Sequence, residues 1–260
     1  MPFPNFEGKH AHDPLMTPEA MLRYRLERGM LPADATVPTG VVITYQKELW
    51  SAAQKFEETT AFGGRHPYDC LHLLDRTEHR VGVIGNFGIG APIAAIVLED
   101  LIALGVRRFV SIGTAGALQR TSSIGDVIVC DEAVRDEGVS HHYVSPSRLA
   151  SGSPRLTGEL AAHLEKAGVT FERGAAWTVD SPYRETVEEA RHYQAEGVWC
   201  VEMEAAALFA VAEYRNVDLA GAFCISDSLA DLEWDPQFHS PVLRSQMWRL
   251  FQAAVDTLAG

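Results

Sequence analysis

From Thr39 onward, short apolar runs alternate with longer segments whose apolar positions recur every three or four residues. β-Strands are predicted for the runs GVVITY, CLHLL, RVGVIGN, RRFVSIG and GDVIVCDEAV, and for stretches 170–178, 197–201 and 218–226. Helices are predicted at about 47–58, 155–167, 185–195, 203–215 and 240–259, and in GIGAPIAAIVLEDLIALG after its glycine turn. This alternation, with strands that are mostly apolar throughout, indicates a single three-layer α/β/α domain around a mostly parallel or mixed sheet.

Residues 1–38 follow a different pattern from the rest of the chain. They contain six prolines, no clear strand and one short helix in TPEAMLRYRLERG, which Thr17 is expected to cap and Gly29 to end. We therefore predict an N-terminal arm over 1–38 and one domain over 39–260. The arm is expected to lie on this domain or on a partner subunit.

Composition narrows the possible partners. The 260 residues carry a formal net charge of −13, which argues against nucleic acid or an anionic membrane as a partner of the general surface. A small anionic ligand is not excluded, because it needs only a few local donors. The four scattered cysteines predict buried free thiols, and without a signal peptide or a membrane-spanning run the expected location is the cytoplasm. The histidines lack H-x-x-x-H or H-E-x-x-H spacing, so no metal site is expected.

Four predicted strands end in small or polar residues, in the stretches GNFGIG, SIGTAGAL, VEMEA and CISDSLAD. Ligands of such folds collect at the carboxyl ends of strands, so these four ends are expected to converge on one site. Each has a simpler interpretation as well. GNFGIG is a tight turn that lacks the dinucleotide spacing, Thr114 could face an anion or only a turn, and Asp227 could cap the next segment. Glu202 and Glu204 could simply favour the start of a helix.

Together, GIGAP, IGTAGAL, GDVIV, VEMEAAAL and ISD, in this order and at these intervals, resemble the purine nucleoside phosphorylase and uridine phosphorylase family over about residues 39–257. The combination of VEMEA with the later SD is its specific part. The resemblance implies a phosphorylase/hydrolase-like fold with a partly barrel-like sheet. It also implies a pentosyltransferase that cleaves the N-glycosidic bond of a nucleoside, most often by phosphorolysis.

The resemblance assigns roles to five residues of the last two motifs. Glu204 would hold the ribose 2′- and 3′-hydroxyls, Met203 would pack against the sugar, and Val201 and Glu202 would line the same wall. A carboxylate suits this place because it accepts two hydrogen bonds from a diol and stabilises an oxocarbenium-like transition state. Asp227 would protonate or hydrogen-bond N7 of the leaving base, and its presence favours a purine.

WTVDSPYRE matches the segment of the family that stacks on the base, with one departure. Pro182 stands where the family usually has phenylalanine, and Tyr183 beside it is the candidate for stacking. Arg184 could reach a carbonyl of an oxopurine or of a pyrimidine. Tyr183 and Arg184 could equally form a surface turn.

The phosphate site departs further from the family. The family carries G-D-P-x-R after its first strand, where this chain has TYQKELW, and an arginine where this chain has Ser111. Bidentate phosphate recognition is typical of arginine, so substitutes are needed. The candidates for phosphate and pocket contacts are Thr114, Gly116, Gly88, Lys47 and Arg65. Arg65 is expected to act from a neighbouring subunit of a homodimer or a ring of dimers, and His10 or His12 could reach a neighbour's ribose 5′ end.

The hydrolytic branch of the family, which resembles methylthioadenosine/S-adenosylhomocysteine nucleosidase, also lacks those arginines. It positions water with a glutamate after the first strand, for which Glu48 is the candidate here. We expect phosphorolysis of a purine-type ribonucleoside to free base and ribose 1-phosphate, with inorganic phosphate as co-substrate and no cofactor. The alternatives are a phosphate-independent nucleosidase and a non-catalytic nucleoside-binding protein on the same fold.

Overall fold

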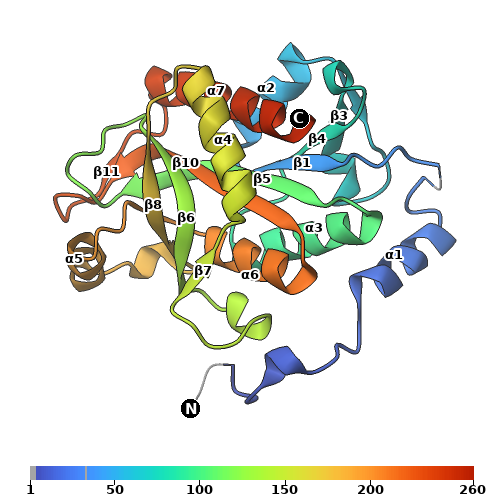
Figure 1. Ribbon diagram of the computed structural model, residues 1–260, viewed down its shortest axis with the longest axis horizontal. Coiled ribbons are helices and arrows are strands. Elements are labelled where there is room, and N and C mark those ends of the chain that lie inside the picture. Colours follow the sequence, from blue (N-terminus) through green and yellow to red (C-terminus); the bar gives the residue numbers. More distant parts are fainter. Residues whose placement is uncertain (1–3, 33) are drawn as a thin grey trace.

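The computed structural model describes residues 4–32 and 34–260 (Figure 1). Its strands form one eleven-stranded sheet. The strands are β1 Gly40–Thr44, β2 Thr59–Ala61, β3 Leu71–Leu74, β4 Val81–Ile84, β5 Arg108–Ala117, β6 Val127–Asp136, β7 Leu149–Ser151, β8 Phe171–Val179, β9 Cys200–Glu202, β10 Asp218–Ser228 and β11 Asp235–Pro236. The α-helices are α1 Pro18–Glu27, α2 Lys47–Phe56, α3 Ala91–Leu104, α4 Pro154–Lys166, α5 Val187–Ala195, α6 Ala205–Arg215 and α7 Pro241–Ala259.

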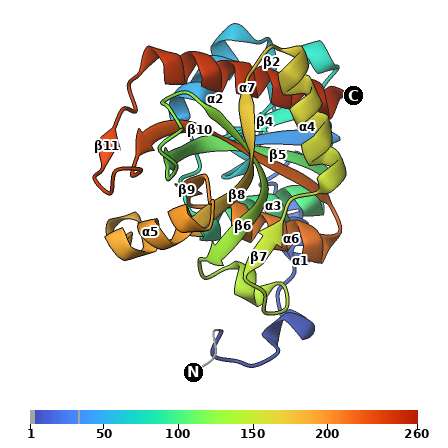
Figure 2. The ribbon, with the colours of Figure 1, turned by 60° about the vertical axis from the view of Figure 1, so that its left-hand side comes forward.

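Part of the sheet closes on itself. Strand β5 pairs with β10, β10 with β6, β6 with β8, β8 with β9, and β9 again with β5. Figure 2 shows these strands grouped around a common centre. Strands β1, β4, β3 and β2 continue outward from β5, and both parallel and antiparallel pairs occur. The prediction of a mixed, partly barrel-like sheet is confirmed.

Helices cover both faces of the sheet. The apolar side chains of α3 and α6 belong to one buried cluster, and those of α2, α4 and α7 belong to another. Helix α7 turns Leu243, Met247, Leu250 and Phe251 into the core, as its periodicity predicts. The three-layer prediction is therefore confirmed. Ser240 stands at the N-cap of α7, but its side chain makes no capping hydrogen bond.

Strand β5 is longer than predicted. The strand predicted for RRFVSIG ends at Gly113, but β5 continues through Ala117. Thr114 and Ala115 pair with β10, and Gly116 and Ala117 pair with both β10 and β9. Small residues suit this position because strands crowd it from two sides. The short strands β2, β7 and β11 were not predicted, because two or three residues are too few to show a period.

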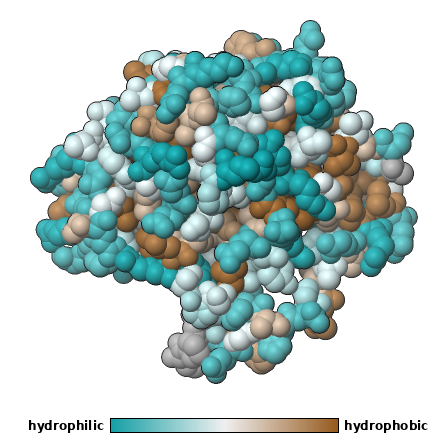
Figure 3. All heavy atoms as spheres, in the orientation of Figure 1, coloured by the Kyte–Doolittle hydropathy of each residue, from teal (hydrophilic) through white to brown (hydrophobic). Residues whose placement is uncertain are grey.

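The arm packs on the domain through α1. Thr17 caps this helix by accepting a hydrogen bond from the Ala20 N–H, as predicted. Arg25 forms an ion pair of 2.7 Å with Asp100 of α3, and Leu31 is buried in the core. Figure 3 shows apolar side chains gathered over the segment that joins α1 to β1. Residues 1–3 and 33 of the predicted arm lie outside the described residues.

The four cysteines are free and buried, as predicted. Within the described ranges, no helix has the length and apolar character needed to cross a membrane.

Candidate active site

A cavity of about 630 Å³ opens where the carboxyl ends of several strands meet. It is lined by residues from the ends of β5, β9 and β10 and from the segments that follow β1, β4, β8 and β10. The predicted convergence of strand ends is therefore observed. Eight of the predicted site residues line this cavity: Thr114, Gly116, Tyr183, Val201, Glu202, Met203, Glu204 and Asp227.

Glu202 caps helix α6. Its carboxylate accepts hydrogen bonds from the N–H groups of Glu204 and Ala205, at 2.7 and 2.8 Å. It also accepts one from the Thr178 hydroxyl, which in turn accepts from the Ala206 N–H. Glu202 therefore satisfies the free N–H groups at the start of the helix, the structural role that its position in the sequence left open.

Glu204 occupies the N-cap position but does not cap the helix. Its Oε1 accepts a 2.6 Å hydrogen bond from the Gly90 N–H, in the glycine turn before α3, and the backbone N–H of Met203 also favours its charged form. Burial raises the pKa of Glu204, and repulsion from Glu202 raises it further. A nearly buried carboxyl group thus lines the cavity and keeps lone pairs for a ligand.

Asp227 is placed by a β-bulge in β10. The pairing of β10 with β5 shifts between Ile225 and Asp227, so that Ser226 is an extra residue. The Ser226 hydroxyl donates to Asp227 Oδ1 at 2.7 Å, and Trp234 Nε1 donates to Oδ2 at 2.9 Å. Both oxygens of the carboxylate are therefore held by neutral donors, in a residue that is only 9% exposed.

Gly116 provides the space that Asp227 needs. A Cβ atom at this position would lie 3.2 Å from Asp227 Oδ2 and 2.6 Å from Leu229 Cδ1. The second distance is shorter than any ordinary contact between carbon atoms. Any larger residue would therefore force the Leu229 side chain to move and would crowd the Asp227 carboxylate.

Two further side chains line the cavity from the segment that follows β8. Tyr183 lies at the mouth and is 99% exposed, so its ring has no neighbour that would prevent stacking. Glu185 lines the same region, and burial followed by repulsion from Asp227 raises its pKa to about 7. Arg184 is exposed and does not line the cavity.

The side of the cavity where the resemblance implies phosphate carries neutral groups that hydrogen-bond to one another. Ser111, which stands where an arginine was expected, is buried and lies 2.9 Å from the Tyr45 hydroxyl. The Gln46 side chain donates to Thr114 Oγ1 at 3.0 Å. Among the described residues that line the cavity there are four carboxyl groups but no lysine, arginine or histidine.

The remaining predicted residues are not brought to the cavity within one chain. Gly88, Lys47, Arg65 and Glu48 are all exposed and outside its lining. Gly90, two residues after Gly88, is the turn glycine that contacts the site, because its N–H points at Glu204. His10 and His12 of the arm are likewise absent from the lining.

Sequence reasoning missed several lining residues, among them Gln46, Glu185, Trp234 and Phe238. Gln46 follows β1 within two residues and Glu185 follows Tyr183 within two residues, so proximity to the predicted strand ends was an available signal. Trp234 and Phe238 lie in the largely exposed segment between β10 and α7, which has no periodic pattern.

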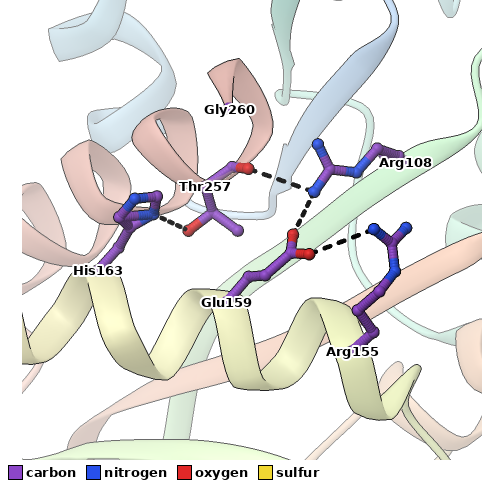
Figure 4. Close-up of a pocket in the computed structure, with 6 residues that line it drawn as sticks. All are labelled: Arg108, Arg155, Glu159, His163, Thr257 and Gly260. Carbon is purple, nitrogen blue, oxygen red and sulfur yellow. Dashed lines mark hydrogen bonds and ion pairs between the residues drawn. The ribbon is translucent and has the colours of Figure 1, made fainter.

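A second, smaller cavity lies between α4, α7 and the start of β5 (Figure 4). It contains Arg108 and Arg155, which both form ion pairs with Glu159, and Arg155 also pairs with Asp218. These arginines are neutralised by their own neighbours. The cavity shares no residue with the larger one.

Comparison with known proteins agrees with this architecture. The family model described as the phosphorylase superfamily matches residues 25–256. The chain is 35% identical over 144 residues to a guanosine phosphorylase of Halorubrum lacusprofundi, covering 55% of this chain and 59% of that protein. It is 33% identical over 157 residues to a uridine phosphorylase of Thermococcus kodakarensis, covering 54% and 55%. The matches thus span little more than half the length of these relatives.

A solved structure shows the same fold. A purine nucleoside phosphorylase of Toxoplasma gondii, in complex with immucillin-H, superimposes with a TM-score of 0.73 at 19% identity. The superposition covers 86% of this chain and 91% of that structure.

Proposed function

The chain belongs to the phosphorylase superfamily, and from that membership we propose that it cleaves a purine-type ribonucleoside by phosphorolysis to free base and ribose 1-phosphate. The observation that carries the proposal is the placement of Glu204 and Asp227 in one cavity. The names of the relatives, guanosine phosphorylase and uridine phosphorylase, support this class of reaction. We place the enzyme in the cytoplasm.

Glu204 binds the ribose in this proposal. Its Oε1 is already fixed by the Gly90 N–H, and the carboxyl group lines the cavity. A carboxylate in this state accepts the hydrogens of the 2′- and 3′-hydroxyls, and Met203 lies next to it in the lining. As the glycosidic bond breaks, positive charge develops on the sugar, and the ionised form of Glu204 stabilises it.

Asp227 serves the leaving base. Cleavage leaves negative charge on the base, which a proton or hydrogen bond from Asp227 to N7 of a purine neutralises. Glu185 lies beside Asp227, close enough for their charges to repel. As an acceptor, Glu185 suits a ring N–H such as that of a 6-oxopurine. Tyr183, Trp234 and Phe238 surround the mouth, where their rings can stack on the base.

Phosphate requires cations that the cavity of one chain lacks among its described lining residues. We propose that a neighbouring subunit supplies them, with Arg65 as the candidate and Thr114 as the hydroxyl donor from the same chain. Arg65 is exposed, and the described chain also exposes large apolar side chains on α1, on the segment after it and on α3: Tyr24, Leu26, Val37 and Ile96. Such residues suit burial in a homodimer or a ring of dimers.

Hydrolysis is a second candidate, favoured by the four carboxyl groups and the lack of a lining cation within the described residues. Water as nucleophile needs no cation to hold it. Glu48, the residue expected to position this water, is exposed and outside the cavity, whereas Gln46 lines it.

The deciding experiment measures base release from a panel of purine and pyrimidine nucleosides, with and without inorganic phosphate. The proposal predicts release of a purine that depends on phosphate and yields ribose 1-phosphate. Equal rates of base release with and without phosphate would contradict phosphorolysis and indicate hydrolysis. Nucleoside binding without any base release would instead indicate a non-catalytic binding protein.

A further inference from the structure

We propose that His66, Asp69 and Cys70 form a binding site for a zinc-like divalent cation. The three residues lie in the turn between β2 and β3, where Tyr68–Cys70 forms a short 3₁₀-helix that runs directly into β3. Their ligand atoms, Nδ1, Oδ1 and Sγ, all lie within 4.8 Å of one another. None of these residues lines the nucleoside cavity, so the proposal is independent of the proposed function.

The spacing of the three atoms suits a tetrahedral ion. Sγ of Cys70 lies 3.8 Å from Nδ1 of His66 and 3.5 Å from Oδ1 of Asp69, and those two atoms are 3.6 Å apart. Zinc bonds of about 2.0–2.3 Å at tetrahedral angles require ligand atoms roughly 3.3–3.6 Å apart. The triangle therefore needs only a small contraction to bind an ion.

The ligand set selects the kind of ion. One thiolate, one imidazole and one carboxylate are typical ligands of zinc, whereas magnesium and calcium prefer oxygen ligands alone. The side chains of His66 and Asp69 are 54% and 53% exposed, so the ion has access and water can complete its coordination. The formal net charge of −13 also favours a cation.

The surrounding structure holds the thiol in place. Cys70 is only 6% exposed, and its carbonyl oxygen accepts a 2.8 Å hydrogen bond from Trp50 Nε1 of α2. Its Sγ also lies 3.8 Å from the carbonyl oxygen of Asn86, in the turn after β4. An ion here would therefore fix the conformation of the β2–β3 turn, which packs against α2 and the turn after β4. The expected role is structural.

The test titrates the full-length protein, treated with EDTA, with cobalt(II) and separately with zinc(II). A thiolate ligand gives cobalt a charge-transfer absorption band, and calorimetry measures zinc affinity. The wild type is expected to bind one ion per chain with this band. Cys70→Ser should abolish the band and weaken zinc binding by more than about 100-fold, because loss of a ligand exceeds the loss of a residue that only orients one.

The chain offers a matched control in the neighbouring pair of His79 and Asp75, which lie 2.9 Å apart without a cysteine. Asp75→Asn should leave cobalt and zinc binding unchanged, whereas His66→Asn and Asp69→Asn should weaken both. These two positions are exposed, so the variants are expected to fold even if Cys70→Ser does not. Absence of the band in the wild type, or equal affinity in His66→Asn, Asp69→Asn and Asp75→Asn, would overturn the proposal.

Discussion

At the residue scale, Glu202 and Glu204 lie only two positions apart but make different hydrogen bonds. The Glu202 carboxylate accepts three hydrogen bonds at the start of α6, two from backbone N–H groups and one from the Thr178 hydroxyl. Glu204 Oε1 accepts instead from the Gly90 N–H, in the turn before α3. A helix cap and the carboxylate proposed to bind ribose are thus adjacent, and the cap fixes the backbone from which Glu204 projects.

Glu204→Gln should lower the kcat/KM for ribonucleosides more than that for 2′-deoxyribonucleosides. An amide accepts through only one of its two groups, so a charge-assisted contact worth about 1.5–3 kcal/mol is lost for a diol. The expected loss in kcat/KM is about ten- to a hundredfold for ribonucleosides, and smaller for deoxyribonucleosides, which lack one hydroxyl. Equal losses in kcat/KM for both kinds of substrate would show that Glu204 does not bind the ribose diol.

Asp227→Asn should lower kcat by about 10²–10⁴-fold, the usual share of acid–base catalysis. Because Trp234 and Ser226 both donate to the carboxylate, the amide leaves one donor without an acceptor. The denaturation midpoint should therefore be measured beside the kinetics. A folded variant with wild-type kcat would contradict the role of Asp227.

At the scale of elements, the site depends on how β5 and β10 meet. The bulge at Ser226 changes which side chain faces the cavity, and Gly116 on β5 leaves room for it. The carboxyl end of β5, with its small residues from Gly113 to Ala117, is thus part of the proposed site as well as of the barrel.

Gly116→Ala should reduce both stability and kcat. Its Cβ would lie 2.6 Å from Leu229 Cδ1, an overpacking that typically costs about 1–3 kcal/mol. The control is Gly158→Ala in α4, whose Cβ meets no atom within 4 Å. That change should stabilise the protein by about 0.5–1 kcal/mol, because alanine favours helices, and leave kcat unchanged. Wild-type kcat in Gly116→Ala would show that Asp227 does not need this space.

At the scale of the whole molecule, four carboxyl groups share one cavity in an acidic protein. Burial raises the pKa of Glu202, Glu204 and Glu185 above their ordinary value of 4.5. The folded chain therefore keeps protons that the unfolded chain has released. The resulting stability is complete below the unfolded pKa and is lost as the pH rises through the folded values.

Glu204→Gln should consequently stabilise the protein more at about pH 8 than at about pH 5, by the order of 1–3 kcal/mol, since each pKa unit corresponds to about 1.4 kcal/mol. Urea denaturation at the two pH values measures the difference. Glu48→Gln, at an exposed position, is the control and should show no such change. A pH-independent effect of Glu204→Gln would mean that this carboxyl group does not resist ionisation.

Assembly also belongs to the scale of the whole molecule. If Arg65 acts across a subunit interface, Arg65→Ala should raise the KM for phosphate about ten- to a hundredfold. Co-expression of Arg65→Ala with Glu204→Gln should then restore activity, because mixed dimers contain one site with both native residues. Activity no higher than the mean of the two variants, or a monomer by light scattering, would contradict a shared site.

The sequence by itself determined the order of the elements and the residues at the strand ends. Periodicity and caps are local properties, so β1, α3, α6 and α7 could be placed from their own residues. The rule that ligands gather at the carboxyl ends of strands then sufficed to predict that Glu204, Asp227 and Thr114 lie together.

Only the tertiary structure decided how these ends are arranged. The pairings of β5 with β9 and β10 join residues about a hundred positions apart, which no local pattern encodes. They extend β5 beyond its predicted end at Gly113, through Ala117. The bulge at Ser226, the entry of Trp234 and Glu185, and the exposure of Arg65 away from the cavity follow from that packing. The closed sheet brings the side chains of the site together, and its closure depends on pairings along the whole chain.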